Sequence, residues 1–569
     1  MGFYRKARKL VLHPQMFFRD AKLKKMAQQA AVQVAVLQAQ KALPAPKPAV
    51  AAPAAVAAKK PAPAALAKKP AAPPLAKKPD SADFEIWLTY SRLVRNFSKA
   101  FPVNVIKYKS IHFWPALRFY IWLRLICAIL GKNIKGKNLI TSSPSLNWRK
   151  TYEDVHGAVC VDDLTGSSAP EDFLIFSNQN SVDLCRVGDR SYNRLSDPLF
   201  EVLENYGSVR KVELLKGQGP LAKHRYHEPT YILPSIIRTS RHHLLMSGLQ
   251  EATVSMVAAF PAAELSESII NMFVDEFFNL KETYKKILLE YKPKAVFFSP
   301  IDYSYPLILA CRECGVVAVD IQHGNHVGFN LPYNHWDEAP DRGYDLFPDA
   351  FLAWGSREQK AMSRSFPSTK IVTAGYPWLD FFTKLMEGEN KVATQVLSMT
   401  KNYRFVVAVT MRDQVQFPAL LADIIADPRA TENGILFIIK PHPKNDRLEG
   451  IPASTNVVLP KGIKEMSIAD LASHVDLHVT VNSSSIFEFE YYGVPSFVFG
   501  KEPLSDYEDL LEEGRLKYFS SADDFYREFD GLADRQTFEP LIDNRSDQLH
   551  EFIISIIDRD EVGNLASIR

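Results

Sequence analysis

The chain has few cysteines, and they are scattered. Its 569 residues include five, at positions 127, 160, 185, 311 and 314. A disulfide-stapled secreted scaffold needs a denser and more regular set, so this class is disfavoured and a reducing cytoplasm is expected. Cys311 and Cys314 have the C-x-x-C spacing of redox and zinc sites, but no second pair accompanies them. We therefore interpret both as partly buried thiols of a helix.

Long apolar runs are also lacking. No charge-free apolar stretch is long enough to predict a membrane-spanning helix, and no secretory signal is visible. The most apolar segment, residues 110–131, is interrupted by Arg118 and Arg124. It is either an amphipathic helix lying in a membrane interface, which we favour, or a helix packed on the first domain.

Acidic residues are nearly absent from the first 79 positions. This part holds sixteen Lys or Arg and one acid, Asp20, and so carries +15, which leaves −12 of the net +3 for residues 80–569. An acidic body argues against nucleic acid as a partner. Residues 1–29 mix basic and aromatic side chains, which is typical of a segment that binds an anionic membrane surface. Residues 30–82 are rich in Ala, Pro and Lys, which predicts a disordered linker.

The rest of the chain alternates strand-like and helical segments. A long amphipathic helix is predicted over residues 268–291. Apolar runs predict buried strands at 172–178, 295–300, 316–321, 349–355, 370–375, 405–410, 435–440, 456–460, 476–481 and 496–500. Near-continuous apolar strands indicate parallel sheets covered on both faces. We therefore expect two Rossmann-like domains, 83–385 and 386–569, with a cleft between them.

One strand ends in an unusual loop, "IIKPHPKND". Ligands of parallel sheets bind outside the carboxyl ends of the strands. Pro441 and Pro443 stiffen this loop and present His442, which can donate to a phosphate, while Lys440 can add positive charge. The alternative is a structural loop histidine.

A second strand leads into a serine run, "HVTVNSSSIFEFEYYGVP". Ser483, Ser484 and Ser485 fall where a helix begins, and their hydroxyls with the helix amides can hold an anion. Glu488 follows on the first turn, where it can accept hydrogen bonds from sugar hydroxyls. The alternative is an ordinary serine cap. If both loops lie at adjacent strand ends, they form a pocket for the phosphates and ribose of a nucleotide.

These two motifs resemble the paired His-Pro and Ser-Ser signature of bacterial sialyltransferases and polysialyltransferases, which use CMP-sugars. "SSSIFEFEYYGVP" is also similar to the S-S-x-x-x-E…G-x-P element of GT-B glycosyltransferases, which implies phosphate contacts for Ser484 and Ser485 and a ribose contact for Glu488. Capsule Kdo transferases and teichoic acid glycerophosphotransferases are similar too. The latter have H-G and G-x-P-x-x-D elements, here His323-Gly324 and residues 375–380. The resemblance covers about 295–500 and implies an α/β, GT-B fold.

The catalytic base is less clearly marked. The strand-end sequence "VDIQHGNHVG" places Gln322, His323 and Gly324 towards the expected cleft. The sialyltransferase D/E-D/E-G motif that carries the base has no clean copy at a strand end, so the candidates by position are His323, Asp183 and Asp302. Either aspartate could instead be a turn residue. Arg412 could contact an acidic group of donor or acceptor. No acid has metal-ligand spacing with the histidines, so neither a metal nor another cofactor is expected.

These observations predict a cytoplasmic glycosyltransferase, peripheral on the inner face of the cytoplasmic membrane. It would build a bacterial capsule or lipopolysaccharide by inverting transfer from a nucleotide sugar to a glycan or glycolipid, with CMP-sialic acid or CMP-Kdo favoured. Two alternatives stay open. One is phosphotransfer from a CDP-polyol to a teichoic-acid-type polymer, and the other is a non-catalytic scaffold of a polysaccharide assembly complex.

Overall fold

The computed structural model describes residues 80–129, 158–178, 183–215, 225–234, 241–385, 396, 398–411, 416–443, 447–464, 466–534, 538–544 and 547–558. Contacts divide the chain into two compact units, Met1–Ala82 and Asp83–Arg569. The expected membrane segment 1–29 and nearly all of the expected linker 30–82 lie outside the described residues. The described fold is therefore that of the second unit.

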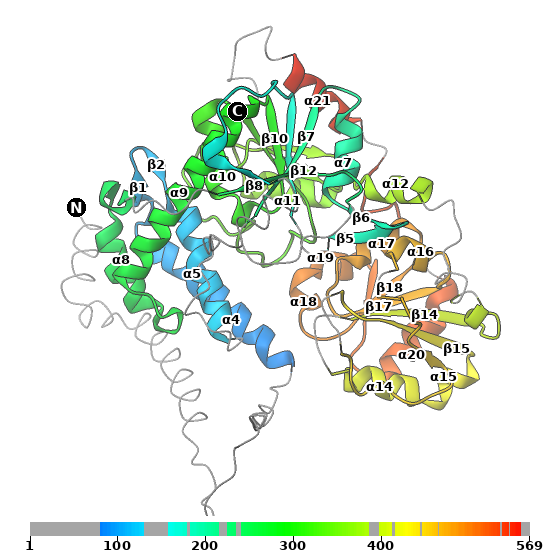
Figure 1. Ribbon diagram of the computed structural model, residues 1–569. Coiled ribbons are helices and arrows are strands. Elements are labelled where there is room, and N and C mark those ends of the chain that lie inside the picture. The colour runs from blue at the N-terminus through cyan, green and yellow to red at the C-terminus, as the bar shows by residue number, and fades with distance from the viewer. Residues whose placement is uncertain are drawn as a thin grey trace, which may run out of the picture. The chain divides into compact units, whose positions relative to one another are not determined.

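The first half of this unit contains an eight-stranded sheet of order β13-β12-β11-β10-β4-β7-β8-β3, in which all neighbours are parallel (Figure 1). The strands are β3 (Val159–Cys160), β4 (Phe173–Phe176), β7 (Val209–Leu214), β8 (Thr230–Leu233), β10 (Ala295–Phe298), β11 (Val317–Ile321), β12 (Ala350–Ala353) and β13 (Lys370–Thr373). From β4 the chain adds β7 and then β8 on one side, and it then adds β10, β11, β12 and β13 on the other side. The switch point of the first sheet therefore lies between β4 and β10.

Helices cover both faces of this sheet: α7 (Ser196–Leu203), α9 (Glu267–Tyr291), α10 (Tyr305–Cys314), α11 (Ser356–Ser365) and α21 (Gln548–Ile557). On one face, Leu199 of α7 and Phe552 of α21 share a core with Phe173. On the opposite face, Tyr284 of α9 contacts Phe176. Helix α21 follows the second sheet in sequence, yet it packs in the core of the first sheet.

A smaller layer packs against α9. It consists of α4 (Asp80–Ala100), α5 (Trp114–Ile129), α8 (Leu249–Ala259) and a three-stranded antiparallel sheet of β1 (Lys107–Tyr108), β2 (Ile111–His112) and β9 (Met246–Ser247). The rings of Phe113 and Tyr120 contact Phe277 and Phe273 of α9.

The favoured interpretation of residues 110–131 as an interfacial helix is wrong for the part that the structure describes. Trp114 and Ile121 of α5 are fully buried. The two arginines that argued against a membrane span are buried as well, since Arg118 donates to the backbone oxygens of residues 334 and 335 and Arg124 donates to that of Ala263. The segment is the packed helix of the alternative reading. Within the described ranges, no helix is both long and apolar enough to cross a bilayer.

The second half contains a six-stranded parallel sheet of order β16-β15-β14-β17-β18-β19. Its strands are β14 (Phe405–Thr410), β15 (Ile435–Lys440), β16 (Val457–Val458), β17 (Leu477–Thr480), β18 (Ser496–Val498) and β19 (Leu516–Tyr518). Around it lie α12 (Trp378–Leu385), α14 (Ala419–Ala426), α15 (Pro428–Glu432), α16 (Ile468–Ala472), α17 (Ser485–Tyr491), α18 (Pro503–Asp506), α19 (Glu508–Glu512) and α20 (Ala522–Asp530). Separate hydrophobic clusters fill its two faces.

A hairpin of the first half joins the two halves. Strands β5 (Leu184–Val187) and β6 (Arg190–Asn193) pair antiparallel. Tyr192 of this hairpin is fully buried in a core that also contains Phe487, Val498 and Leu510 of the second half. The expected α/β class with two Rossmann-like sheets is confirmed.

Each strand predicted from an apolar run is present, and β14 and β15 have the predicted limits. The sequence does not predict β7, because "VRKVEL" alternates apolar and charged residues. Two of its three charged side chains are buried in pairs: Lys211 contacts Asp197, and Glu213 contacts Arg225. The thiols of Cys311 and Cys314 both lie on α10 and are free, with Cys311 buried.

Candidate functional site

The second sheet has its switch point between β14 and β17. Numbered along the chain, its strands follow the order 3-2-1-4-5-6 of a Rossmann sheet. Ligands of such sheets bind outside the carboxyl ends of the strands, where the order reverses. The loops that follow β14 and β17 are therefore in the position of a nucleotide site. Arg412, which follows β14, lies outside the described residues.

The two predicted phosphate motifs lie on either side of this point and not at adjacent strands, as the sequence suggested. Strand β14 separates β15, which leads to His442, from β17, which leads to the serine run. Two strand spacings correspond to about 10 Å. The sequence gives the strands in chain order. That β14 lies between β15 and β17 is evident only from the order of the strands in the sheet. His442 itself is half-buried.

Lys440 is buried at the end of β15, and its ammonium group holds the backbone. Its Nζ donates to the carbonyl oxygens of Ile463 at 2.8 Å, Lys464 at 3.1 Å and Met466 at 2.7 Å. These bonds use the three donors of an ammonium group. In this structure Lys440 anchors residues 463–466 to the strand end, so its contribution to a nucleotide site is its positive charge.

The serine run is divided by its burial. Ser483 and Ser484 are half-buried, and the Ser483 hydroxyl accepts from the backbone nitrogen of Ser485 at 3.2 Å. Ser485 is buried, and its hydroxyl lies 3.2 Å from Thr410 Oγ1 and 3.3 Å from His478 Nε2. The side chain of Ser485 thus fastens the start of α17 to the sheet, whereas Ser483 and Ser484 keep accessible surface.

His478 is a site-positioning residue that the sequence analysis missed. It is fully buried on β17, with Nε2 2.8 Å from Thr410 Oγ1 and Nδ1 2.8 Å from Ser496 Oγ. Its ring stacks on Phe489 with 4.1 Å between centroids. Burial lowers the pKa of His478 to about 3, so the ring is neutral at physiological pH. A histidine at an inward position of the apolar run "DLHVTV" is the signal that could have found it.

Glu488 lies beneath the serine run with one oxygen held and one open. Its side chain is 6% exposed, and Oε1 lies 3.3 Å from Nη1 of Arg194. Oε2 is buried without a hydrogen-bond partner. Burial raises the pKa of Glu488, while the charges of Arg194 and Lys440 lower it. A buried acceptor with no partner costs free energy, so Oε2 is suited to a hydroxyl donor from a ligand.

Three loops of the first sheet converge at its own switch point. Asp183 follows β4, Asp302 follows β10, and His323 follows β11. Hydrogen bonds link the loops after β4 and β10: Asn193 Nδ2 donates to the oxygen of Asn178 at 3.1 Å, and Asn178 Nδ2 donates to that of Ser299 at 3.5 Å. The aspartates and histidine that the sequence proposed as bases therefore belong to one edge of one sheet.

Gln322 and Gly324 shape the loop that carries His323. Gln322 is fully buried; its Oε1 accepts from the nitrogen of Trp354 at 2.6 Å and its Nε2 donates to the oxygen of Gly324 at 2.9 Å. Gln322 thus ties the loop to the end of β12. A Cβ atom added at Gly324 would meet no atom within 4 Å, so the space above this glycine is open. His323 beside it has an exposed side chain.

The groups at this edge are mostly uncharged at neutral pH. Burial raises the pKa of Asp302 to about 7 and raises that of Asp320 well above its usual value. Burial lowers the pKa of His326 well below its usual value. Tyr333 connects the group, because its hydroxyl donates to Asp320 Oδ2 at 3.1 Å and its ring stacks on His326. Such groups can accept or pass a proton.

The two edges are joined through α18 and α19. Asn325 Nδ2, in the loop after β11, donates to the oxygen of Asp506 at 3.0 Å. Asp506 Oδ2 accepts from Asn482, which immediately precedes the serine run, at 3.4 Å. Arg357 of α11 adds a two-bond ion pair to Asp509 at 2.6 and 2.8 Å. The loop that carries His323 and the loop that carries the serines therefore contact a common element.

The G-x-P-x-x-D element, residues 375–380, contacts the last residue of α17. Gly375 has φ of +66°, and a Cβ atom there would lie 2.2 Å from Asn544 Oδ1, so only glycine fits. Asp380 accepts a hydrogen bond from the hydroxyl of Tyr491 at 2.8 Å. This element braces α17 against the first half.

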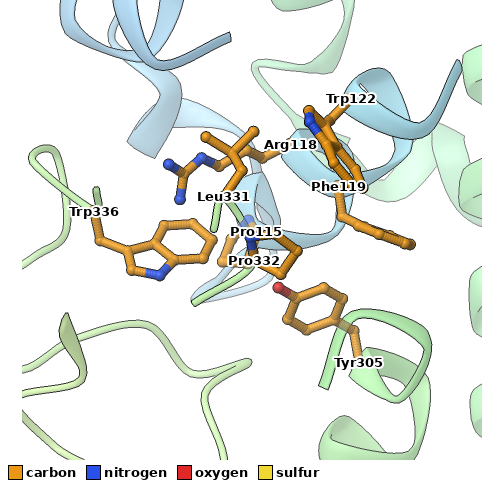
Figure 2. Close-up of a pocket in the computed structure, with 8 residues that line it drawn as sticks. All are labelled: Pro115, Arg118, Phe119, Trp122, Tyr305, Leu331, Pro332 and Trp336. Carbon is orange, nitrogen blue, oxygen red and sulfur yellow. The ribbon is translucent and has the colours of Figure 1, made fainter. Parts of the chain in front are cut away.

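A narrow hollow lies beside the first edge (Figure 2). It contains none of the residues proposed from sequence, and it is lined by Pro115, Arg118, Phe119, Trp122, Tyr305, Leu331, Pro332 and Trp336. The guanidinium group of Arg118 lies 3.8 Å from the Trp336 ring centroid. The hollow marks where α5 closes over the loops that follow β10 and β11. Among the described residues, no group of three or more His, Cys, Asp or Glu could hold a metal ion.

No family model and no curated protein matches the chain. Solved structures resemble it only distantly. S. aureus MnaA with UDP is 13% identical, covers 68% of this chain and 96% of its own, and has a TM-score of 0.42. The UDP-GlcNAc 2-epimerase of Methanocaldococcus jannaschii is 11% identical, with 67% and 98% coverage and a TM-score of 0.42. The wall teichoic acid polymerase TagF is 10% identical, with 78% and 99% coverage and a TM-score of 0.37. Similarity this low does not decide an activity.

Proposed function

We propose that this protein is a glycosyltransferase that transfers a sugar from a nucleotide donor, with inversion, to a growing bacterial surface polysaccharide. The observation that carries the proposal is Glu488. A buried carboxylate with one oxygen paired to Arg194 and the other without a partner lies next to the switch point of a Rossmann sheet. The ribose hydroxyls of a nucleotide are the donors that such an oxygen accepts.

The phosphate side of the donor site would be formed by the accessible groups around this carboxylate. Ser483 and Ser484 follow β17, and His442 follows β15, on the two sides of β14. The fixed charges of Lys440 and Arg194 would offset the charge of the leaving phosphate, as an oxyanion site does. The motif resemblance favours a CMP-linked acid, sialic acid or Kdo, as the donor.

The first edge would supply the base. An inverting transfer needs a group that takes the proton of the acceptor hydroxyl. Asp302 is the favoured candidate, because its pKa of about 7 lets it both ionise and accept a proton near neutral pH. His323, whose side chain is exposed, is the second candidate, and Asp183 the third.

The proposal is tested by thermal unfolding of the full chain with CMP, CDP, UDP and GDP, for the wild type and for His442→Ala. A rise in melting temperature with CMP that is lost in His442→Ala supports the CMP-sugar site. A preference for UDP would refute the CMP-linked donor but keep the glycosyltransferase. Failure of all four nucleotides would refute the proposal and leave the scaffold. Product analysis separates the two transfer reactions, since a CDP-polyol enzyme yields an alcohol phosphate ester and not a glycoside.

A further inference from the structure

An ion pair between the two halves reaches directly into the proposed donor site. Arg194 follows β6, in the first half, and its Nη1 lies 3.3 Å from Oε1 of Glu488, on α17 of the second half. The arginine side chain is 21% exposed and the glutamate side chain 6%. The attraction within a pair this sheltered is screened little by salt.

The backbone that carries Arg194 is fixed on both sides. Its nitrogen donates to the oxygen of Asp183 at 2.8 Å. The preceding residue, Asn193, is buried, and its Oδ1 accepts from the nitrogens of Leu195 and Ser196, both at 3.0 Å. Asn193 thus closes the turn into α7. The guanidinium group therefore starts from a rigid base, which a residue that aims another side chain requires.

The electrostatics of Glu488 also depend on Arg194. Burial favours the protonated carboxyl, and of the charges that oppose burial, that of Arg194 is the largest and that of Lys440 the next. The ammonium group of Lys440 donates to three backbone oxygens, whereas Arg194 donates to the carboxylate itself. With Oε1 held by Arg194, Oε2 is the oxygen left for a ligand.

We propose that Arg194 is a positioning residue of the donor site: it holds Glu488 ionised and oriented, so that Oε2 accepts the ribose hydroxyls. This inference rests on the proposed function, because the role of Glu488 does. It means that nucleotide binding by the second half requires a side chain from the first half.

The test is titration calorimetry of the full chain with whichever of CMP, CDP, UDP and GDP binds the wild type most tightly, from pH 5 to pH 9. In Arg194→Gln the affinity should fall about tenfold at pH 7, which corresponds to about 1.4 kcal/mol. Because the ionised carboxylate is the acceptor, affinity should rise with pH through the pKa of Glu488. Without the guanidinium charge that pKa rises, so the midpoint should move to higher pH. Arg194→Lys, which keeps the charge, should bring the midpoint most of the way back to its wild-type pH.

Arg357→Gln is the matched control. Arg357 is also an arginine of the first half that pairs with an acid of the second, Asp509, but it does not contact Glu488. If Arg357→Gln lowers nucleotide affinity and moves the midpoint as much as Arg194→Gln, the effect is a loosening of the two halves and the inference is wrong. It is equally wrong if Arg194→Gln binds like the wild type. If the wild type itself binds no nucleotide, the proposed function fails first, and the two failures are distinguishable.

Discussion

The two sheets have carboxyl-end edges of opposite character. The edge of the second sheet has compensated charge: Glu488 is buried with Arg194 and near Lys440. At the edge of the first sheet, burial leaves carboxyl groups with raised pKa values and histidines with lowered ones, as in Asp302 and His326. Fixed charges suit the binding of a charged nucleotide, and groups that titrate near neutral pH suit proton transfer. Under the proposed function, the second sheet would bind the donor and the first would supply the base.

The largest expected effect comes from the first edge. Asp302→Asn removes the proposed base, so kcat should fall by about 10²- to 10⁴-fold, the range of general base catalysis. The binding of the nucleotide, which belongs to the second edge, should change less than about twofold. The measurement is sugar transfer to acceptor alongside calorimetry with the nucleotide. A kcat close to that of the wild type would remove Asp302 from the chemistry and make His323→Asn the next variant to assay.

A reciprocal result is expected from the second edge. Glu488→Gln keeps the shape but loses the ionised acceptor, which is worth about 1.5–3 kcal/mol in a hydrogen bond to a charged group. Nucleotide affinity should therefore fall about 10- to 100-fold, while kcat at saturating donor changes little. Calorimetry and donor-saturation kinetics measure the two quantities. A Glu488→Gln protein that keeps full affinity and loses kcat would reverse the assignment of the two edges.

The pH dependence of kcat/KM separates the candidate bases. If Asp302 is the base, its pKa of about 7 predicts a fall of about tenfold per pH unit below that value and a plateau above it. If His323, whose side chain is exposed, is the base, the inflection should survive in Asp302→Asn and be lost in His323→Asn. The profile is measured in a series of buffers on both sides of pH 7, at constant ionic strength. Asp302→Asn serves as the control, since it should abolish the inflection near pH 7.

The smallest effect is expected at Asp320, the neighbour of Asp302. It is fully buried, its pKa is raised well above its usual value by burial, and its Oδ2 accepts from Tyr333. A carboxyl that is already protonated loses little when an amide replaces it. Asp320→Asn should therefore change kcat by no more than roughly twofold. It should change the melting temperature only slightly. A strong loss of activity would show that Asp320 carries charge, and the uncharged character of the first edge would then be wrong.

The sequence predicted the elements well and their spatial order less well. Apolar runs such as those of β14 and β15 fix strand limits because both faces of these strands are covered by apolar cores. The insertion of β14 between His442 and the serine run depends on the sheet order, which no local pattern encodes. Likewise, "FLIF" predicts β4 from its letters alone, whereas Lys211 and Glu213 disguise β7 because their partners are distant in sequence.

The candidate site was predictable where a motif is local. Glu488 and the serines are one helical turn apart, so their grouping follows from the sequence. Arg194 was not predictable, because it reaches Glu488 across 294 positions. His478 left only one local signal, a histidine within an apolar run, and its partners Thr410 and Ser496 are not evident from that run. Arg118 misled for the same reason, since its backbone acceptors lie more than 200 residues away. Long-range pairing of polar groups is the information that periodicity does not contain.

Helix α21 has a consequence for how the protein is made. Leu549, Phe552 and Ile553 of this helix complete the core of a sheet whose strands lie between residues 159 and 373. During synthesis on the ribosome, the part of this face that α21 covers therefore stays exposed until the entire second half has been translated. An N-terminal fragment of residues 80–385 should accordingly bind a hydrophobic dye, and a synthetic peptide of residues 547–558 should reduce that binding. We therefore expect the need for chaperones to depend on the order in which the two halves are translated.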